Sequence, residues 1–214
     1  MTFSIRFARA ALAIAVPGAI AAPLAMVVAA APAAAASEAA DMAKFRAHLA
    51  GVQSMTANFV QTDGRGRSAA GTLQLKRPGR IRFQYGSGDL LLVANGGKLN
   101  FIDYQVGQKS SWALNKTPLG VLLSTNPDLK GRAKIVASKD PNVVVVRARD
   151  PAQFGTLILA FLRSPSAPGG LMLYGWTAID GQNKKTTVKL SNQRYNVAVP
   201  EGAFSFTEPK KRRG

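Results

Sequence analysis

Hydrophobic and polar residues alternate most regularly between residues 71 and 85. Leu73 and Leu75 stand two apart, and in an extended strand Arg77 falls on the same face as these two leucines. After a Pro-Gly pair, a second apolar row follows at alternate positions: Ile81, Phe83 and Tyr85. The pattern predicts two antiparallel strands joined by a tight turn. Because a cation is costly to bury, Arg77 on an apolar face indicates either the mouth of a cavity or a functional site.

Short strand-like segments fill most of the remaining chain. They cover residues 55–61, 90–94, 98–104, 111–114, 134–138, 142–149, 156–163, 170–179, 184–191 and, as a short final strand, 203–206. Asn-Gly-Gly at 95–97 and Asp-Gly at 180–181 are typical of hairpin turns. About eleven short strands in hairpin succession, with few helices, predict a mainly β (α+β) fold in which one antiparallel sheet curls toward a barrel.

An N-terminal helix is predicted over residues 38–52. Its apolar residues are spaced three, four and three positions apart, as on one helix face: Met42, Phe45, Leu49 and Val52. Ser37 is a suitable N-cap, and the helix is expected to end at Gly51. His48 lies in this helix and is expected at the surface or an edge rather than in a catalytic role.

Residues 117–127 interrupt the strand pattern. Thr117 as cap and Pro118 at the first helical position begin a short helix, which is expected to close at Asn126. Four large aliphatic residues fall within barely two turns: Leu119, Val121, Leu122 and Leu123. These are too many for one face of so short a helix, so the segment is predicted to be a plug or lid over the open side of the sheet.

The N-terminus has the pattern of an export signal. Arg6 and Arg9 precede an apolar run over residues 10–31, and alanines at 34–36 match the small-residue pattern before a cleavage site. A membrane anchor is the alternative, because the run approaches the length of a spanning helix. Prolines inside the run favour a cleaved signal peptide over residues 1–36. Residues 37–209 then form a single domain that is expected to be exported.

The charge of the chain is strongly positive. Its formal net charge is +17, and residues 210–213 are all basic. Such a surface favours polyanions, either nucleic acid or the anionic face of a membrane. Export argues against nucleic acid and leaves transient contact with an anionic membrane surface, or a role of the charge in solubility alone. The tail over residues 210–214 is predicted to be disordered.

Few catalytic schemes are compatible with this composition. The chain has no cysteine and a single histidine, and its 11 acidic residues form no pair at informative spacing. Disulfides and zinc-cysteine sites are therefore excluded, and we expect no enzyme activity, no metal and no cofactor. A curled apolar sheet with a lid suits an acyl-chain carrier, because burying hydrocarbon contributes roughly 0.8 kcal/mol per methylene and needs no covalent step.

The chain resembles the LolA family of periplasmic outer-membrane lipoprotein carriers between residues 42 and 209. The most specific piece is Gly-x-Leu-x-Leu-Lys-Arg-Pro-x-x-Ile-x-Phe at residues 71–83, preceded by Phe-x-Gln at 59–61. The hairpin at 92–99, Thr117-Pro118 and the ending Phe-x-Phe-x-x-Pro at 204–209 agree in order and spacing.

The resemblance implies an incomplete, half-open antiparallel barrel closed by helices over an apolar cavity for lipid chains. It implies a monomeric carrier that takes acylated lipoproteins from an ATP-driven release complex of the inner membrane to a receptor lipoprotein of the outer membrane. It also implies that Arg77 is a latch, bonded to the lid backbone when the lid is closed. The cavity and lid candidates are Leu73, Leu75, Ile81, Phe83, Leu92, Phe101, Leu119, Leu122 and Leu123.

Two alternatives to this function remain open from the sequence. One is a carrier or sensor of another periplasmic lipid or glycolipid, which would share the cavity. The other is a basic polyanion-binding protein without a cavity, whose binding would be sensitive to salt.

Overall fold

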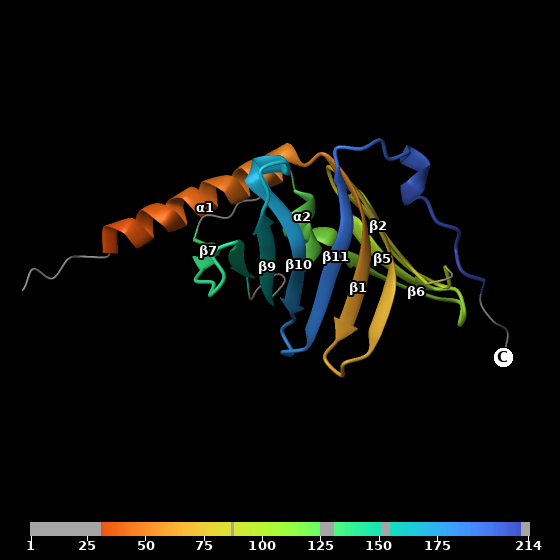
Figure 1. Cartoon of the computed structure of the whole chain (residues 1–214). Helices are drawn as coiled ribbons and strands as arrows, with labels where there is room; N and C mark the ends of the chain where they lie inside the picture. The colour runs from red at the N-terminus through yellow and green to blue at the C-terminus, as the bar shows by residue number, and fades with distance from the viewer. Residues whose placement is uncertain (1–30, 87, 125–130, 151–154, 211–214) are drawn as a thin grey trace, which may run out of the picture.

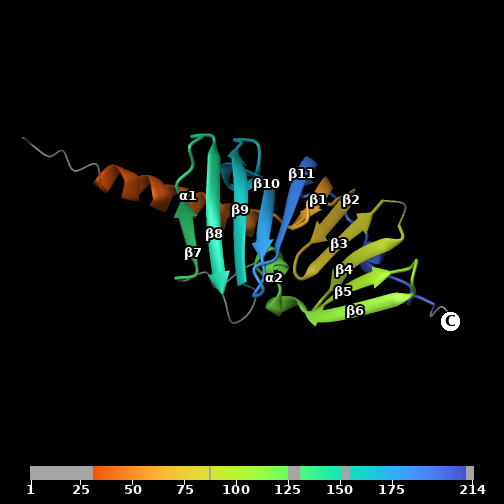
Figure 2. The ribbon, with the colours of Figure 1, turned by 90° about the horizontal axis from the view of Figure 1, so that it is seen from below.

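The body of the protein is one antiparallel sheet of eleven strands (Figures 1 and 2). The computed structural model describes residues 31–86, 88–124, 131–150 and 155–210. The strands are β1 Ser54–Asp63, β2 Ser68–Lys76, β3 Arg80–Tyr85, β4 Leu90–Asn95, β5 Lys98–Asp103, β6 Gln108–Ala113, β7 Ala133–Val136, β8 Val143–Asp150, β9 Gly155–Arg163, β10 Leu171–Ile179 and β11 Lys185–Tyr195. The predicted mainly β fold of about eleven strands is confirmed.

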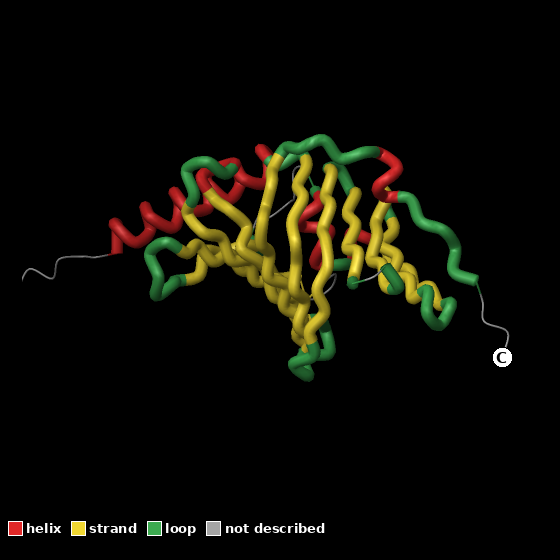
Figure 3. The backbone as a smooth tube through the Cα atoms, turned by 45° about the vertical axis from the view of Figure 1, so that its right-hand side comes forward, coloured by secondary structure: helices red, strands yellow, loops and turns green. Residues whose placement is uncertain are grey.

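The strand order explains why the barrel is incomplete. The order is β6-β5-β4-β3-β2-β1-β11-β10-β9-β8-β7, so two meanders meet where β1 pairs with β11. β6 and β7 form the two outer edges of this sheet and do not pair with each other. The sheet therefore bends around its core but stays open on one side, as the backbone tube shows (Figure 3).

The inner face of the sheet carries the main core. The alternation along β2 and β3 places Leu73 opposite Phe83 and Leu75 opposite Ile81, and all four side chains are buried. Phe83 lies edge-on to Phe59, with ring centroids 5.0 Å apart. The period of two that predicted these strands thus produces the apolar layer on which the site is built.

The outer face of β3–β5 carries a second apolar cluster beneath residues 197–208, which we call the C-terminal strap. Phe204 is buried there, Arg80 lies over its ring, and Glu201 forms ion pairs with both Lys76 and Arg80. The predicted strand at 203–206 is wrong, because Glu201–Phe204 forms the 3₁₀ turn η3. The local bond from the Ala203 amide to the Pro200 carbonyl turns the backbone away from any ladder.

Helix α1, Ala31–Gly51, packs against β7, β10 and the turn η2 at Pro168–Gly170 (Figure 1). The prediction of Ser37 as the N-cap is wrong, since the helix already includes the preceding alanines, which have the highest helix propensity. Arg163 donates to both carboxylate oxygens of Asp41, at 2.6 and 2.8 Å, and so fixes α1 to β9. No helix in the described part of the chain has the length and apolar character to cross a membrane.

Candidate lid, latch and cavity

A short helix lies on the concave side of the sheet (Figures 2 and 3). This helix, α2 at Pro118–Leu123, follows the 3₁₀ turn η1 at Leu114–Lys116, and we call α2 the lid. Thr117 occupies the expected N-cap position, but its hydroxyl donates to the Leu114 carbonyl at 2.7 Å instead of capping the helix. The helix has its C-cap at Ser124, and the expected end at Asn126 lies outside the described residues.

The lid is apolar and closely packed. Leu119, Leu122 and Leu123 are all buried. A Cβ atom at Gly120 would come within 2.8 Å of the Leu114 carbonyl oxygen, so only glycine allows α2 to lie this close to η1. The concentration of aliphatic residues that predicted a covered segment therefore corresponds to a helix buried on the core side.

Arg77 connects the β2–β3 turn to the end of the lid. Its side chain is only 6% exposed, and its Nε donates to the Leu122 carbonyl at 3.1 Å. The amide of Gly79 donates to the Leu123 carbonyl at 3.3 Å. Carbonyls in the last turn of a helix have no partner within the helix, so these two bonds, which we call the latch, satisfy groups that α2 leaves open.

The buried guanidinium is only partly satisfied. Arg77 Nη1 is fully buried and has no hydrogen-bond partner among the described residues. Burial lowers the pKa of Arg77 to about 10, so the group stays charged at neutral pH. A charged donor without a partner costs free energy in the closed state, which opposes the gain from the latch.

His48 is the second polar group of this interior. The prediction that it lies at the surface or an edge is wrong, because it is 3% exposed beneath η2. Its Nδ1 lies 3.0 Å from the Pro168 carbonyl, and its ring meets those of Phe161 and Tyr195 edge-on. Burial lowers the pKa of His48 to about 4, so the imidazole is neutral at neutral pH.

A small cavity lies between α1, the sheet and the lid. Its volume is about 10 Å³, roughly the room for one water molecule. Five of the residues expected from the sequence line this cavity: Leu73, Leu75, Arg77, Ile81 and Leu122. The other six lining residues were not expected: His48, Leu49, Val52, Met55, Leu173 and Trp176. No acyl chain fits in this space, so the structure represents a closed form.

The remaining candidates lie around this cavity rather than in its wall. Phe83 is buried in the adjoining core, whereas Leu92 and its cross-strand neighbour Phe101 are half-buried toward the β6 edge. Leu119 and Leu123 belong to the lid but not to the cavity wall. The periodicity of the predicted N-terminal helix could have identified Leu49 and Val52.

An open depression lies on the other side of the latch. Its volume is about 410 Å³, and its lining includes Pro78, Gly79, Gly120 and Leu123. Because Arg77 lines the inner cavity and the next two residues line the depression, the latch separates the interior from the surface. Moving the lid would join the two spaces.

No other chemistry is evident near the cavity. Among the described residues, no group of three or more His, Cys, Asp or Glu side chains gathers in a way that could hold a metal. The arrangement of a closed apolar interior, an apolar lid and a two-bond latch is suited to binding and release.

Comparison with known proteins finds one family that matches most of the chain. The model of the outer membrane lipoprotein carrier protein LolA matches residues 50–207. An outer-membrane lipoprotein carrier protein of Chromobacterium violaceum is 27% identical over 185 residues, covering 81% of this chain and 86% of that protein. The protein of the same description from Pseudomonas fluorescens is 28% identical and covers 79% of this chain and 85% of its own length.

Solved structures show a more distant likeness. The LolA superfamily protein NE2245 from Nitrosomonas europaea has a TM-score of 0.43 at 11% identity and covers 78% of this chain and 97% of its own. The MucA/MucB complex of Pseudomonas aeruginosa has a TM-score of 0.45 at 12% identity, with 79% and 61% coverage. Likeness at this level says nothing about function. Because the family model matches well over half of the sequence, the chain belongs to the outer membrane lipoprotein carrier protein LolA family.

Proposed function

We propose that the protein is a periplasmic carrier that shields the acyl chains of lipoproteins and releases them through the latch at Arg77. It receives this cargo from an ATP-driven release complex of the inner membrane and delivers it to a receptor lipoprotein of the outer membrane. No covalent step is assigned to it. Residues 1–36 are its cleaved export signal, residues 37–209 are the carrier domain and residues 210–214 are a basic tail.

One observation carries this proposal. The only bond from the Arg77 side chain to a described residue is to the lid carbonyl of Leu122, and the same side chain lines the closed cavity. Because this side chain contacts both the cavity and the lid, a molecule that enters the cavity can change its bond to the lid. Entry of hydrocarbon would displace the lid, and the Leu122 carbonyl and the guanidinium would then separate.

Transfer from water into the cavity is favourable for an acyl chain. Each methylene taken out of water contributes roughly 0.8 kcal/mol. The interior that would receive the chain is lined by aliphatic and aromatic residues, and among the described lining residues His48 and Arg77 are the titratable ones. Since the cavity now has a volume of only about 10 Å³, binding requires the lid to move.

Native mass spectrometry of the protein recovered from the periplasm tests the proposal. We expect a population that carries a mass equal to that of an acylated lipoprotein, and a larger loaded fraction for Arg77→Leu. Arg65→Leu, which removes an exposed arginine from the β1–β2 turn, is the control and should match the wild type. A bound lipid without protein would instead identify a carrier of another lipid, and no bound lipid in any variant would refute a carrier role.

A further inference from the structure

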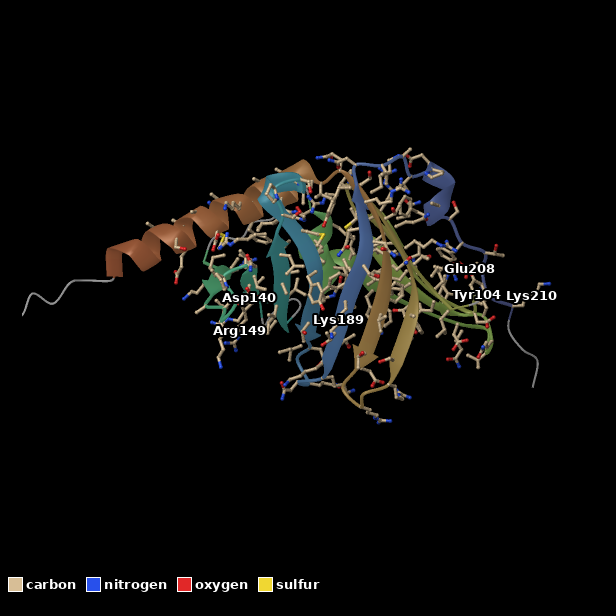
Figure 4. All side chains as sticks on the ribbon, in the orientation of Figure 1. Tyr104, Asp140, Arg149, Lys189, Glu208 and Lys210 are labelled. Carbon is tan, nitrogen blue, oxygen red and sulfur yellow. The ribbon has the colours of Figure 1, made fainter. Side chains whose placement is uncertain are left out.

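The outer face of strands β7–β11 carries five cations, on β7, β8 and β11. Strand pairing aligns its outward positions, so that Lys134 lies opposite Arg147 and Lys189 lies opposite Gly175. The cations at these outward positions are Lys134, Arg147, Arg149, Lys185 and Lys189, and all of them are exposed. Figure 4 labels Arg149 on β8 and Lys189 on β11. We call this surface the β7–β11 outer face.

The described outward positions of these strands carry no acidic side chain, and the exposed Asp140 and Asp180 lie in the turns that border the face. None of the five cations forms an ion pair with a described residue. The paired carboxylates lie elsewhere: Asp41 on α1, Asp63 in the β1–β2 turn, and Glu201 and Glu208 in the C-terminal strap. The positive charge of this face is therefore not neutralised by described carboxylates.

Apolar side chains lie between these cations. Val136 is 36% exposed and Tyr174 is 42% exposed. Outward residues of the central strands, such as Val145, Ile158 and Leu162, remain half-buried. On β4 and β5 the outward residues Leu91, Val93 and Ile102 are instead buried beneath the C-terminal strap. These partly exposed aliphatic and aromatic residues add apolar surface between the cations.

We propose that the β7–β11 outer face docks on the surface of an anionic phospholipid membrane. Unpaired cations are attracted by the negative surface potential of such a membrane, and aliphatic and tyrosine side chains favour the headgroup region. The cations lie on β7, β8 and β11, on both sides of β9 and β10 in the same sheet, and this spread suits an extended anionic surface rather than a single charged group. This function goes beyond cargo binding and would hold the carrier near a membrane while the lid works.

Vesicle co-sedimentation tests this docking. The protein is purified after export, its N-terminus is read by mass spectrometry, and it is mixed with vesicles of phosphatidylglycerol and phosphatidylethanolamine or of phosphatidylcholine. We expect binding to the anionic vesicles that weakens as salt is added. Removing three cations in Arg147→Gln, Arg149→Gln, Lys189→Gln should reduce binding by about a hundredfold, or about fivefold for each cation.

A matched triple variant separates this face from net charge. Arg65→Gln, Lys98→Gln, Lys116→Gln removes the same charge from exposed positions outside the face and should bind nearly as well as the wild type. Equal loss in both triple variants, or no binding of the wild type to anionic vesicles, would overturn the proposal. Circular dichroism confirms that both variants fold. Because the assay compares vesicle binding between variants and does not measure cargo, the outcome does not depend on whether the protein carries lipoproteins.

Discussion

Replacing Arg77 by leucine should slow the release of cargo while leaving the fold intact. The substitution removes the donor to the Leu122 carbonyl and leaves that carbonyl without this partner in the closed lid. It also removes the buried Nη1 that has no partner. These two changes affect the closed state in opposite directions, and their difference sets the expected size of the effect.

The magnitude follows from the two contributions. A hydrogen bond from a charged donor is worth about 1.5–3 kcal/mol, and relief of one unsatisfied buried donor returns about 1 kcal/mol, the lower end of the usual range of about 1–3 kcal/mol. The closed, empty form of Arg77→Leu is therefore destabilised by about 0.5–2 kcal/mol relative to the open form. Since a tenfold change corresponds to about 1.4 kcal/mol, the loaded form should be favoured by about two- to thirtyfold.

The assay is transfer of a fluorescent acylated lipopeptide from the purified protein to acceptor vesicles, followed by stopped-flow fluorescence. Arg77→Leu should release the lipopeptide about tenfold more slowly than the wild type, within the range just derived. Arg65→Leu should release it at the wild-type rate, and the thermal midpoints of all three proteins should agree within a few degrees. Release from Arg77→Leu at or above the wild-type rate, with its fold intact, would refute the latch.

Three further predictions follow from other contacts. Gly120→Ala places a Cβ atom 2.8 Å from the Leu114 carbonyl oxygen and so destabilises the closed lid. It should therefore also slow the release of the lipopeptide in the same transfer assay. Asp41→Asn should lower the free energy of unfolding by about 1–3 kcal/mol because it breaks the partly buried pair with Arg163; a change below 0.5 kcal/mol in urea denaturation would contradict this. Burial lowers the pKa of His48 from 6.5 to about 4. Between pH 6.5 and pH 4 the imidazole is therefore protonated in the unfolded chain but neutral in the folded protein. The free energy of unfolding should fall by about 3 kcal/mol as the pH drops through this range. His48→Phe should flatten that part of the curve, and an unchanged slope would show that other groups cause it.

The strands and the position of Arg77 could be predicted from the sequence because a period of two fixes which face each residue occupies. Leu73, Leu75, Arg77 and Ile81 all line the cavity, in agreement with the parity of β2 and β3. The short aliphatic segment before Asn126 indicated a covered helix for a similar local reason. These features depend on neighbours in sequence, which the pattern records directly.

The wrong predictions concern residues whose surroundings come from distant segments of the chain. His48 is buried because η2 lies over it, and η2 begins 120 residues later at Pro168. The predicted strand at 203–206 failed because Phe204 is buried against the outer face of a sheet formed by earlier residues. The residue pattern within either segment does not show that another part of the chain covers it. Local patterns therefore place His48 at the surface or an edge and residues 203–206 in a strand.

The latch is too weak to exclude cargo, and this is consistent with a carrier. Its charged bond is worth about 1.5–3 kcal/mol before the cost of burying the guanidinium. An acyl chain gains roughly 0.8 kcal/mol per methylene, so a handful of methylenes already exceeds the latch. In the proposed function, Arg77 does not decide whether a long chain enters, but its bond to Leu122 would lower the free energy of the closed form that remains after release. A charged, partly unsatisfied residue at this point makes that contribution small, so release is aided while loading remains favourable.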